Sequence, residues 1–479
     1  MIRPEFPEPA ALVKGRPQPM ADSRIPLLLL LLDFRHAEID SIASLGRSNG
    51  PTESNAASFD QPYGGSYLSP FWYVWLPSED LAKTVAKRSL LVKSFLEVWG
   101  EGATWEELLA SIQAYPRECI QRWCMPNISF KILVDGWGRA VKQEQQLDII
   151  NKFDFLGLQG PIKMQTPDLT LRVIIADPAD NNGLPEVPYR IYFGRDVACS
   201  DRSVIHKYGL PRRKYLGPTS MDTEMAFLMC NQGQVRKGDF VYDPFVGTGS
   251  ILVAASHHGA HTFGADIDIR IVRDGKVNKA GERTDVWDNF RDYNLMSPVG
   301  LMRADSHRPP FRANLQDMFD AIICDPPYGV RAGGKKSVAK SHKITCAETH
   351  IPSTDAYTFE ECLRDLLHLA AKHLKLGGRL VFFLPSVPGV DKAEQTTAHP
   401  MLAMVANCEQ PLTTRYSRRL ITLQKVQPYN AELEQQTWSS EQSLRPPMKS
   451  IHEVVYESQS KAQESGGALH LQRYRGKLV

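Results

Sequence analysis

Residues 239–258 read DFVYDPFVGTGSILVAASHH, and this stretch determines the fold class that we predict. It begins as a short apolar strand ending at Asp243, passes through a glycine-containing turn, and continues from Ser250 as an apolar helix. A strand, a small turn and a helix in this order let a ligand approach the turn backbone and face the helix N-terminus. The turn matches neither GxGxxG nor GKS/T, so nucleotide phosphates are not the expected ligand.

The same alternation of strand and helix continues toward the C-terminus. Strand-like runs follow at 261–266, 301–305, 320–325 and 378–385 with helical segments between them, and a last apolar run at 420–426 has no helix after it. Short buried strands separated by helices predict a mostly parallel sheet. We therefore expect an α/β, Rossmann-like domain over residues 217–428.

Three successive strands of this sheet are expected to end in an acidic residue, namely Asp243, Asp266 and Asp305. Ligands of open parallel sheets bind at the carboxyl ends of the strands. An acid at the place of Asp266, about twenty residues after the turn, can accept hydrogen bonds from both ribose hydroxyls of an adenosine-containing cofactor. Each acid taken alone could equally be a solvated loop residue or a helix cap, but the three together favour a cofactor site.

The fourth strand ends in the motif Asp325-Pro326-Pro327-Tyr328. The two prolines fix φ and direct a backbone carbonyl outward where no helix can begin. Asp325 and the Pro326 carbonyl can then accept both hydrogens of an exocyclic NH2 group, while Tyr328 offers a ring on which a planar base stacks. Because the lone pair of an aromatic amine is delocalised into its ring, such hydrogen bonds are needed to localise it for attack on a methyl group. An ordinary proline turn with a packed tyrosine is the alternative.

Taken in order, these motifs resemble the class I S-adenosylmethionine-dependent methyltransferases that act on exocyclic amino groups. The resemblance is closest to the tRNA (guanine-N2) methyltransferases that modify guanosine ten, through LGPTSMD (216–222), DPFVGTGSILVA, GADID, DAIICDPPYG and SRRLIT (417–422). It implies S-adenosylmethionine as the cofactor, with Asp266 at its ribose, Asp305 at its adenine amino group, and its methionine part surrounded by Asp243, Phe245, Gly247 and Gly249. It also implies that the catalytic residues gripping the target guanine are Asp325, Pro326, Pro327 and Tyr328.

The N-terminal part is similar to the THUMP region with which these enzymes hold tRNA, through SFKILVDGW (129–137), EQQLDIINKF (144–153) and PDLTLRVII (167–175). Strands and helices mixed in this way predict an α+β domain, and one helix is expected over 80–99 with Ser78 as its cap. We expect a loose extension at 1–22, the THUMP-like domain at 23–175, a linker at 176–216 and a loosely ordered tail at 429–479. The family further implies a heterodimer with a small zinc-binding activator subunit.

The composition of the 479 residues is that of a globular protein without a strong charge. Lysine and arginine total 56 against 54 acidic residues, a net charge of +2, so any surface for tRNA must come from local clustering of charge. Eight cysteines form no CxxC pair, which argues against a disulfide scaffold or a metal site and fits the cytoplasm. The apolar run IPLLLLLL at 25–32 is far shorter than the ~20 residues that span a bilayer, so we expect no membrane partner. A signal-peptide core is the alternative, but no small-residue cleavage site follows the run, so we expect a buried strand feeding a helix.

The sequence therefore predicts the catalytic subunit of a tRNA (guanine-N2) methyltransferase that modifies guanosine ten. Two alternatives stay open. One is an amino-methyltransferase of adenine N6 in DNA or RNA, because the DPPY motif alone accepts either base. The other is a non-catalytic RNA-binding subunit, against which the intact acids Asp243, Asp266 and Asp325 argue.

Overall fold

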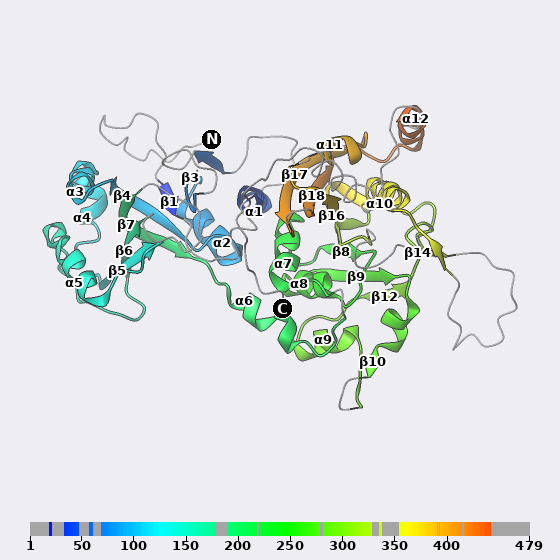
Figure 1. Ribbon diagram of the computed structural model, residues 1–479, viewed down its shortest axis with the longest axis horizontal. Helices are drawn as coiled ribbons and strands as arrows, with labels where there is room; N and C mark the ends of the chain where they lie inside the picture. The colour runs from blue at the N-terminus through cyan, green and yellow to red at the C-terminus, as the bar shows by residue number, and fades with distance from the viewer. Residues whose placement is uncertain are drawn as a thin grey trace, which may run out of the picture. The chain divides into compact units, whose positions relative to one another are not determined.

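The structure, a computed structural model, describes residues 19–21, 33–46, 57–60, 69–177, 189–217, 220–277, 281–327, 335–337, 354–389, 391, 393–413 and 416–441. These residues divide into two compact units, one ending at Asp201 and the other beginning at Arg202 (Figure 1). Each unit has its own sheet and its own buried core, so each is described by itself.

The first unit is built on a four-stranded sheet of order β4-β7-β6-β5. β6 pairs in parallel with β5 and antiparallel with β7, which in turn pairs antiparallel with β4. Its core includes Phe153 stacked on Phe193, with ring centroids 4.1 Å apart. Strands and helices are mixed, as predicted for an α+β domain. Their bounds are β4 (Ser94–Gly102), β5 (Phe130–Trp137), β6 (Leu169–Ala176), β7 (Arg190–Cys199), α3 (Trp105–Ala114), α4 (Arg117–Gln121) and α5 (Gln143–Asn151).

A three-stranded antiparallel sheet of order β1-β3-β2 completes this unit, together with two helices. β1 falls within residues 1–22, which we expected to be a loose extension, and it pairs with β3 instead. The strand expected at 25–32 lies outside the described residues. The elements are β1 (Pro19–Ala21), β2 (Ser58–Asp60), β3 (Phe71–Trp75), α1 (Phe34–Ala43) and α2 (Glu79–Arg88).

Two further expectations for this part of the chain need correction. The stretch 176–216 was expected to be a linker with one strand-like run at 189–195, but that run is β7, an interior strand of the first unit's sheet, hydrogen-bonded to both β4 and β6. The helix expected over 80–99 ends at Arg88, and the chain from Ser94 forms β4. In β4, Glu97 and Glu101 form ion pairs with arginines 98 and 89 residues further along the chain, so tertiary contacts that no local pattern reveals favour the strand.

The second unit contains a seven-stranded sheet of order β12-β9-β8-β13-β16-β18-β17. The first five strands in this order are mutually parallel, while β18 is antiparallel to both of its neighbours. This is the predicted mostly parallel α/β sheet. Strand order reverses between β8 and β13, and a reversal of this kind opens a ligand-binding crevice at the carboxyl ends of the strands. The bounds are β8 (Phe240–Asp243), β9 (His261–Asp266), β12 (Gly300–Arg303), β13 (Phe319–Cys324), β16 (Leu374–Ser386), β17 (Leu402–Pro411) and β18 (Ser417–Lys425).

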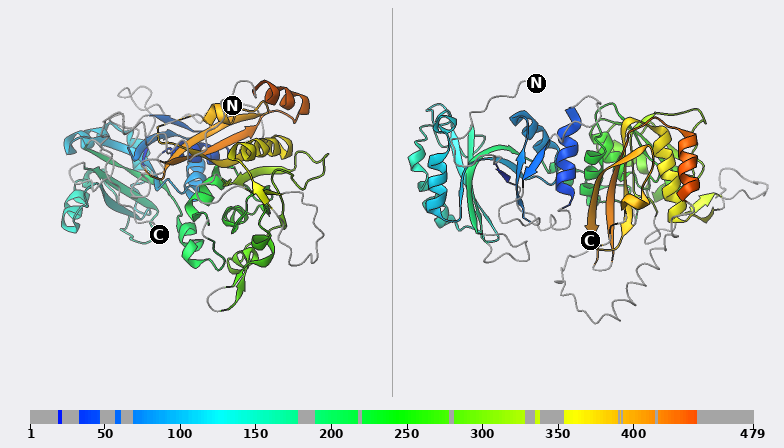
Figure 2. Two further views of the ribbon diagram at one scale, coloured as in Figure 1. Left: turned by 45° about the vertical axis from the view of Figure 1, so that its right-hand side comes forward. Right: turned by 90° about the horizontal axis from the view of Figure 1, so that it is seen from above.

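Helices cover both faces of this sheet (Figure 2). α7 (Thr223–Gln232) and α8 (Ser250–His257) pack on each other over one face. α10 (Phe359–His373) lies on the other, where Leu366 and Ala370 join a core that includes Phe319 and Phe382. The remaining helical segments of this unit are α6 (Ser203–Lys207), α9 (Val286–Asp292), α11 (Ala393–Thr396), α12 (Ala431–Glu441), a 3-10 turn (Leu210–Arg212) and a π-helical turn (Arg270–Asp274).

The C-terminal tail differs from expectation where the structure describes it. Residues 429–479 were expected to be loosely ordered, but Ala431–Glu441 form α12. Its buried Glu434 accepts hydrogen bonds from Tyr429, His368 and His399 at 2.9–3.2 Å. Two short hairpins also belong to this unit, β10 (Lys276–Val277) with β11 (Arg283–Thr284) and β14 (Lys335–Ser337) with β15 (Thr354–Ala356). No helix in the described part of the chain combines the length and apolar composition that crossing a bilayer requires.

Candidate active site

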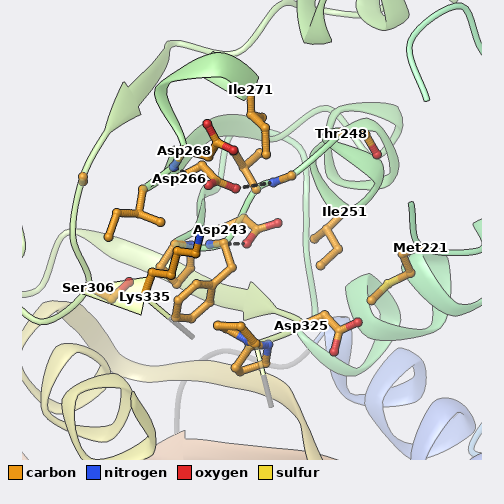
Figure 3. Close-up of a pocket in the computed structure, with 18 of the residues that line it drawn as sticks. Met221, Asp243, Thr248, Ile251, Asp266, Asp268, Ile271, Ser306, Asp325 and Lys335 are labelled. Carbon is orange, nitrogen blue, oxygen red and sulfur yellow. Dashed lines mark hydrogen bonds between the residues drawn. The ribbon is translucent and has the colours of Figure 1, made fainter. Parts of the chain in front are cut away.

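A cavity of about 320 Å³ lies at the carboxyl ends of β8, β9, β12 and β13, where the strand order reverses (Figure 3). Most of its walls come from the ends of these four strands, the residues that follow them and the start of α8. The structure brings seven of the predicted site residues together as lining of this one cavity: Asp243, Phe245, Gly247, Asp266, Asp325, Pro326 and Pro327. Gly249 lies beside them as the residue that caps α8.

The turn between β8 and α8 has a backbone that requires glycine at two positions. Gly247 has φ of +46° and Gly249 has φ of +80°, a left-handed conformation that L side chains rarely adopt. A Cβ on Gly249 would also lie 2.7 Å from Val286 Cγ1. This tight turn leaves the backbone and the N-terminus of α8 accessible from the cavity, as the sequence predicted.

Asp243 is the most buried acid of the site, with 1% of its surface exposed. The backbone N–H of Phe245 donates to its Oδ1 at 2.9 Å. Burial raises the pKa of the Asp243 carboxyl well above its ordinary value, and the nearby charges of Asp266 and Asp325 add to the effect. The free protein therefore holds a proton on Asp243 to a higher pH than an exposed aspartate would.

Asp266 is held at the end of β9 by two backbone donors. The N–H of Gly247 donates to its Oδ2 at 3.1 Å and the N–H of Asp268 to its Oδ1 at 2.9 Å, so the carboxylate is fixed against the turn (Figure 3). Each oxygen keeps a second lone pair directed elsewhere, which suits it to accept from a pair of hydroxyls. Burial raises the pKa of Asp266. Asp268 lines the same cavity but is paired with the guanidinium of Arg270.

Asp305 is not part of the cavity lining, although its neighbours Ala304 and Ser306 are. Its Oδ1 accepts from the N–H of His307 at 3.0 Å, and its Oδ2 accepts from the N–H of Ser337 at 2.7 Å. The side chain therefore ties the β14–β15 hairpin to the end of β12. Its expected contact with an adenine amino group stays a prediction.

The proline motif follows β13 directly, and its first three residues face the cavity. Asp325 Oδ2 lies 3.5 Å from Nη1 of Arg418, which belongs to β18. Tyr328 lies outside the described residues, so its expected stacking role stays a prediction. Within the described ranges, no group of His, Cys, Asp and Glu side chains is arranged to hold a metal ion.

Comparison with known proteins shows the family. Residues 27–202 match the family model of the Tmrp11 THUMP N-terminal domain, and residues 211–351 match that of the RMKL-like methyltransferase domain. The tRNA (guanine(10)-N(2))-methyltransferase TRMT11 of Homo sapiens is 36% identical over 412 residues, which cover 83% of this chain and 87% of that one. The chain belongs to this methyltransferase family. The Dictyostelium discoideum member is 35% identical over 447 residues, covering 88% of this chain and 86% of its own.

Two solved structures are similar to this chain at lower sequence identity. TrmN from Thermus thermophilus is 15% identical with a TM-score of 0.37, covering 83% of this chain and 98% of that one. A possible methylase from Clostridium difficile 630 is 12% identical with a TM-score of 0.36, covering 84% and 98% respectively.

Several residues in or next to the cavity were missed when we looked in the sequence for polar residues at strand ends. Lys335 and Tyr357 line the cavity from the β14–β15 hairpin and the residue after it, which follow the proline motif along the chain. The hydroxyl of Tyr357 donates to Asp365 on α10 at 2.8 Å. Arg418 does not line the cavity but lies next to Asp325, on β18, whose antiparallel direction brings its first residues to the edge where the parallel strands end. The sequence signal for Arg418 was the pair of arginines in SRRLIT, which does not show which of the two faces the site.

Proposed function

We propose that this chain transfers a methyl group from S-adenosylmethionine to the exocyclic N2 amine of guanosine ten in tRNA. The observation that carries the proposal is the placement of Asp325, Pro326 and Pro327 on the same cavity as Asp243 and Asp266. One cavity thus offers acceptors for an aromatic amine and acceptors for a nucleoside cofactor. Membership of the tRNA (guanine(10)-N2)-methyltransferase family supports this choice of base and of position.

The cavity suits S-adenosylmethionine in size and in donor set. Its volume of about 320 Å³ falls in the range of small-molecule sites. We assign the ribose hydroxyls to the carboxylate of Asp266 and the methionine part to the turn formed by Phe245, Gly247 and Gly249, next to buried Asp243. S-adenosylmethionine, when bound, supplies an electrophilic methyl group on a positively charged sulfur.

The proline motif acts on the amine. The carboxylate of Asp325 and the carbonyl of Pro326 accept one N–H each, which turns the nitrogen lone pair away from the guanine ring and toward the methyl carbon. With S-adenosylmethionine bound, the amine would take the methyl group by direct displacement, and the proton lost from the nitrogen would pass to solvent through the Asp325 carboxylate that accepts its hydrogen bond. The rate would come from positioning and from these hydrogen bonds, because the amine needs no strong base before attack.

The base must leave its stack to reach this cavity, and unstacking costs a few kcal/mol. In the proposal, stacking on Tyr328 offsets part of that cost, and the THUMP-containing first unit holds the tRNA. The activator subunit that the family resemblance implies completes the enzyme, in the cytoplasm. A reducing compartment is consistent with the described cysteines, none of which forms a disulfide: 119, 124, 199, 230, 324, 362 and 408.

The test compares two tRNA transcripts that differ in one amino group. The purified chain, with and without the activator subunit, is incubated with S-adenosylmethionine and tRNA carrying either guanosine or inosine at position ten, and the digested nucleosides are weighed. We expect N2-methylguanosine from the guanosine transcript and none from the inosine transcript, since inosine lacks the exocyclic amine. Methyladenosine in RNA or in a parallel DNA duplex reaction would favour the adenine alternative. Cofactor and tRNA binding without any methylated product would favour a non-catalytic RNA-binding subunit.

A further inference from the structure

Arg418, a cationic residue of β18, lies at the edge of the sheet where we place the reaction. Because β18 runs antiparallel to β16, its first residues lie where the parallel strands end, and Arg418 pairs with Pro385 near the end of β16. From there its Nη1 lies 3.5 Å from Oδ2 of Asp325, across the end of the intervening strand. Asp325, which we assign to the target amine, therefore has the guanidinium of Arg418 as a direct neighbour.

Arg418 is held on other sides as well. Its guanidinium carbon lies 3.7 Å from the centroid of the Phe383 ring, a cation–π contact on the same sheet face. Its Nε donates to Oε1 of Gln410 on β17 at 2.7 Å. Only 15% of the side chain is exposed. A guanidinium fixed by a ring and an amide is pre-organised toward Asp325, unlike the mobile lysines and arginines of most surface ion pairs.

Among the described residues, Asp243 and Cys324 also lie near Asp325, and Lys335 lines the same cavity from β14. The carboxyl of Asp243 and the thiol of Cys324 both interact with its charge, and an ionised Asp243 repels it. An ionised Asp325 accepts hydrogen bonds on both oxygens, whereas a protonated one carries a donor that competes with the substrate amine. A guanidinium 3.5 Å away favours the ionised carboxylate over the protonated one.

We infer that Arg418 is a positioning residue for methyl transfer, which keeps Asp325 ionised and fixes its carboxylate to accept the N–H of the target amine. This inference rests on the proposed function. Arg418 acts through Asp325 and does not line the cavity, so its removal should lower the rate with little effect on cofactor binding.

The test uses Arg418→Gln and Arg418→Lys in the full chain with its activator subunit, with Arg419→Gln as the matched control. Arg419 is the next residue of β18, and its two ion pairs, with Asp391 and Glu409 at 3.0 Å each, do not involve the cavity. For Arg418→Gln we expect kcat near pH 7 to fall by about tenfold or more, with unchanged affinity for S-adenosylmethionine. The acid limb of its pH–rate profile should move to higher pH, so that activity partly returns as pH rises. The kcat and acid limb of Arg418→Lys should lie between those of the wild type and of Arg418→Gln. Arg419→Gln should keep the acid limb of the wild type.

Two results would overturn the inference. One is an Arg418→Gln enzyme whose activity falls by the same factor at every pH, as expected for a purely structural residue. The other is a rise in KM for tRNA with kcat and the acid limb unchanged, as expected for a phosphate contact.

A second measurement does not depend on catalysis. In a double-mutant cycle of thermal unfolding, Arg418→Gln should destabilise the wild type more than it destabilises an Asp325→Asn background, where only the contacts with Phe383 and Gln410 remain to be lost. Additive effects would refute the coupling. If the wild type methylates no guanosine, the proposed function fails, while this cycle still decides whether Arg418 stabilises the Asp325 carboxylate.

Discussion

Asp243 and Asp268 lie on one cavity, yet their surroundings shift their carboxyl pKa values in opposite directions. Burial raises the pKa of Asp243, whereas the hydrogen bonds from Arg270 lower the pKa of Asp268 despite its partial burial. A carboxyl whose pKa is raised in the folded protein binds more protons folded than unfolded, so its contribution to stability is lost as pH rises above about 4. A carboxyl whose pKa is lowered stabilises the fold above that pH and loses the contribution as pH falls.

We therefore predict that Asp243→Asn stabilises the free protein while weakening cofactor binding. Near pH 7 the substitution removes the cost of a buried carboxylate, and its melting temperature should exceed that of the wild type by about 2–4 °C for each kcal/mol relieved. The difference should grow with pH above about 4. Asp268→Asn, on the same cavity, should not stabilise the protein. Thermal scans over a pH series and calorimetric titration with S-adenosylmethionine check both parts, and a less stable Asp243→Asn protein would contradict the first.

Among individual residues, the sequence predicted which acids lie at the cavity better than it predicted which residues they contact. Asp243, Asp266 and Asp325 were found because each ends a strand that local patterning reveals. The tie of Asp305 to Ser337 spans 32 residues, and the tie of Asp325 to Arg418 crosses β16, which lies between their strands, so no local pattern contained either one.

The β14–β15 hairpin shows how one element depends on another. Lys336 of β14 donates to Glu361 of α10 at 2.8 Å, and the same hairpin carries Lys335 to the cavity and Ser337 to Asp305. The Lys336 hydrogen bond lowers the pKa of Glu361 to about 2. Glu361 also closes the capping box of α10 with Thr358.

We expect Glu361→Gln to weaken binding of S-adenosylmethionine by up to about fivefold, the effect of losing one partly exposed ion pair. Glutamine can keep the capping box, so the helix itself should be little affected. Glu360→Gln, on the exposed neighbouring residue, is the control. Equal affinities for the two variants in a binding titration would show that this ion pair does not hold the hairpin over the cavity.

Helix α12 is the element that the sequence most underestimated. Its Gln- and Glu-rich composition is typical of a disordered tail, but Glu434 is buried against His368, His399 and Tyr429. Burial opposes ionisation of Glu434, yet the hydrogen bonds from both histidines lower its pKa overall. A single anchoring residue leaves almost no trace in composition.

Glu434→Ala should release α12 and lower the melting temperature by several degrees, since it leaves buried hydrogen-bonding partners unpaired. Hydrogen exchange of residues 431–441 should accelerate. Glu432→Ala, an exposed position of the same helix, should change neither quantity. If both substitutions give the same exchange rates, the Glu434 contacts are not what orders the helix.

For the whole molecule, the two units have separate sheets, and the boundary at residue 201 follows β7 instead of preceding it as expected. β7 was assigned to the linker because it follows the turn-rich stretch after β6, while its other partner, β4, lies about 90 residues earlier in the chain and leaves no local signal. The fold classes of both units were nevertheless predictable, because their strand and helix patterns are mostly local.

A chain beginning at residue 202 should therefore bind S-adenosylmethionine with the affinity of the full chain but methylate tRNA poorly. All described lining of the cavity lies in the second unit, whereas the THUMP-containing unit is assigned to the tRNA. We expect kcat/KM for tRNA to fall by about 10²-fold or more, as when remote binding energy is lost. Methylation by the shorter chain at the rate of the full chain would show that the first unit does not contribute to tRNA recognition.

The rate of N2-methylguanosine formation at position ten by Asp325→Asn tests the central claim most directly. Asparagine keeps the shape of the side chain but replaces one acceptor oxygen with a donor, so it cannot hold the target amine in the same way. In single-turnover reactions with saturating S-adenosylmethionine, the rate should fall by about 10²–10³-fold, with cofactor affinity nearly unchanged. A wild-type rate for Asp325→Asn would contradict the assignment of Asp325 to the target amine, and with it the mechanism proposed for this site.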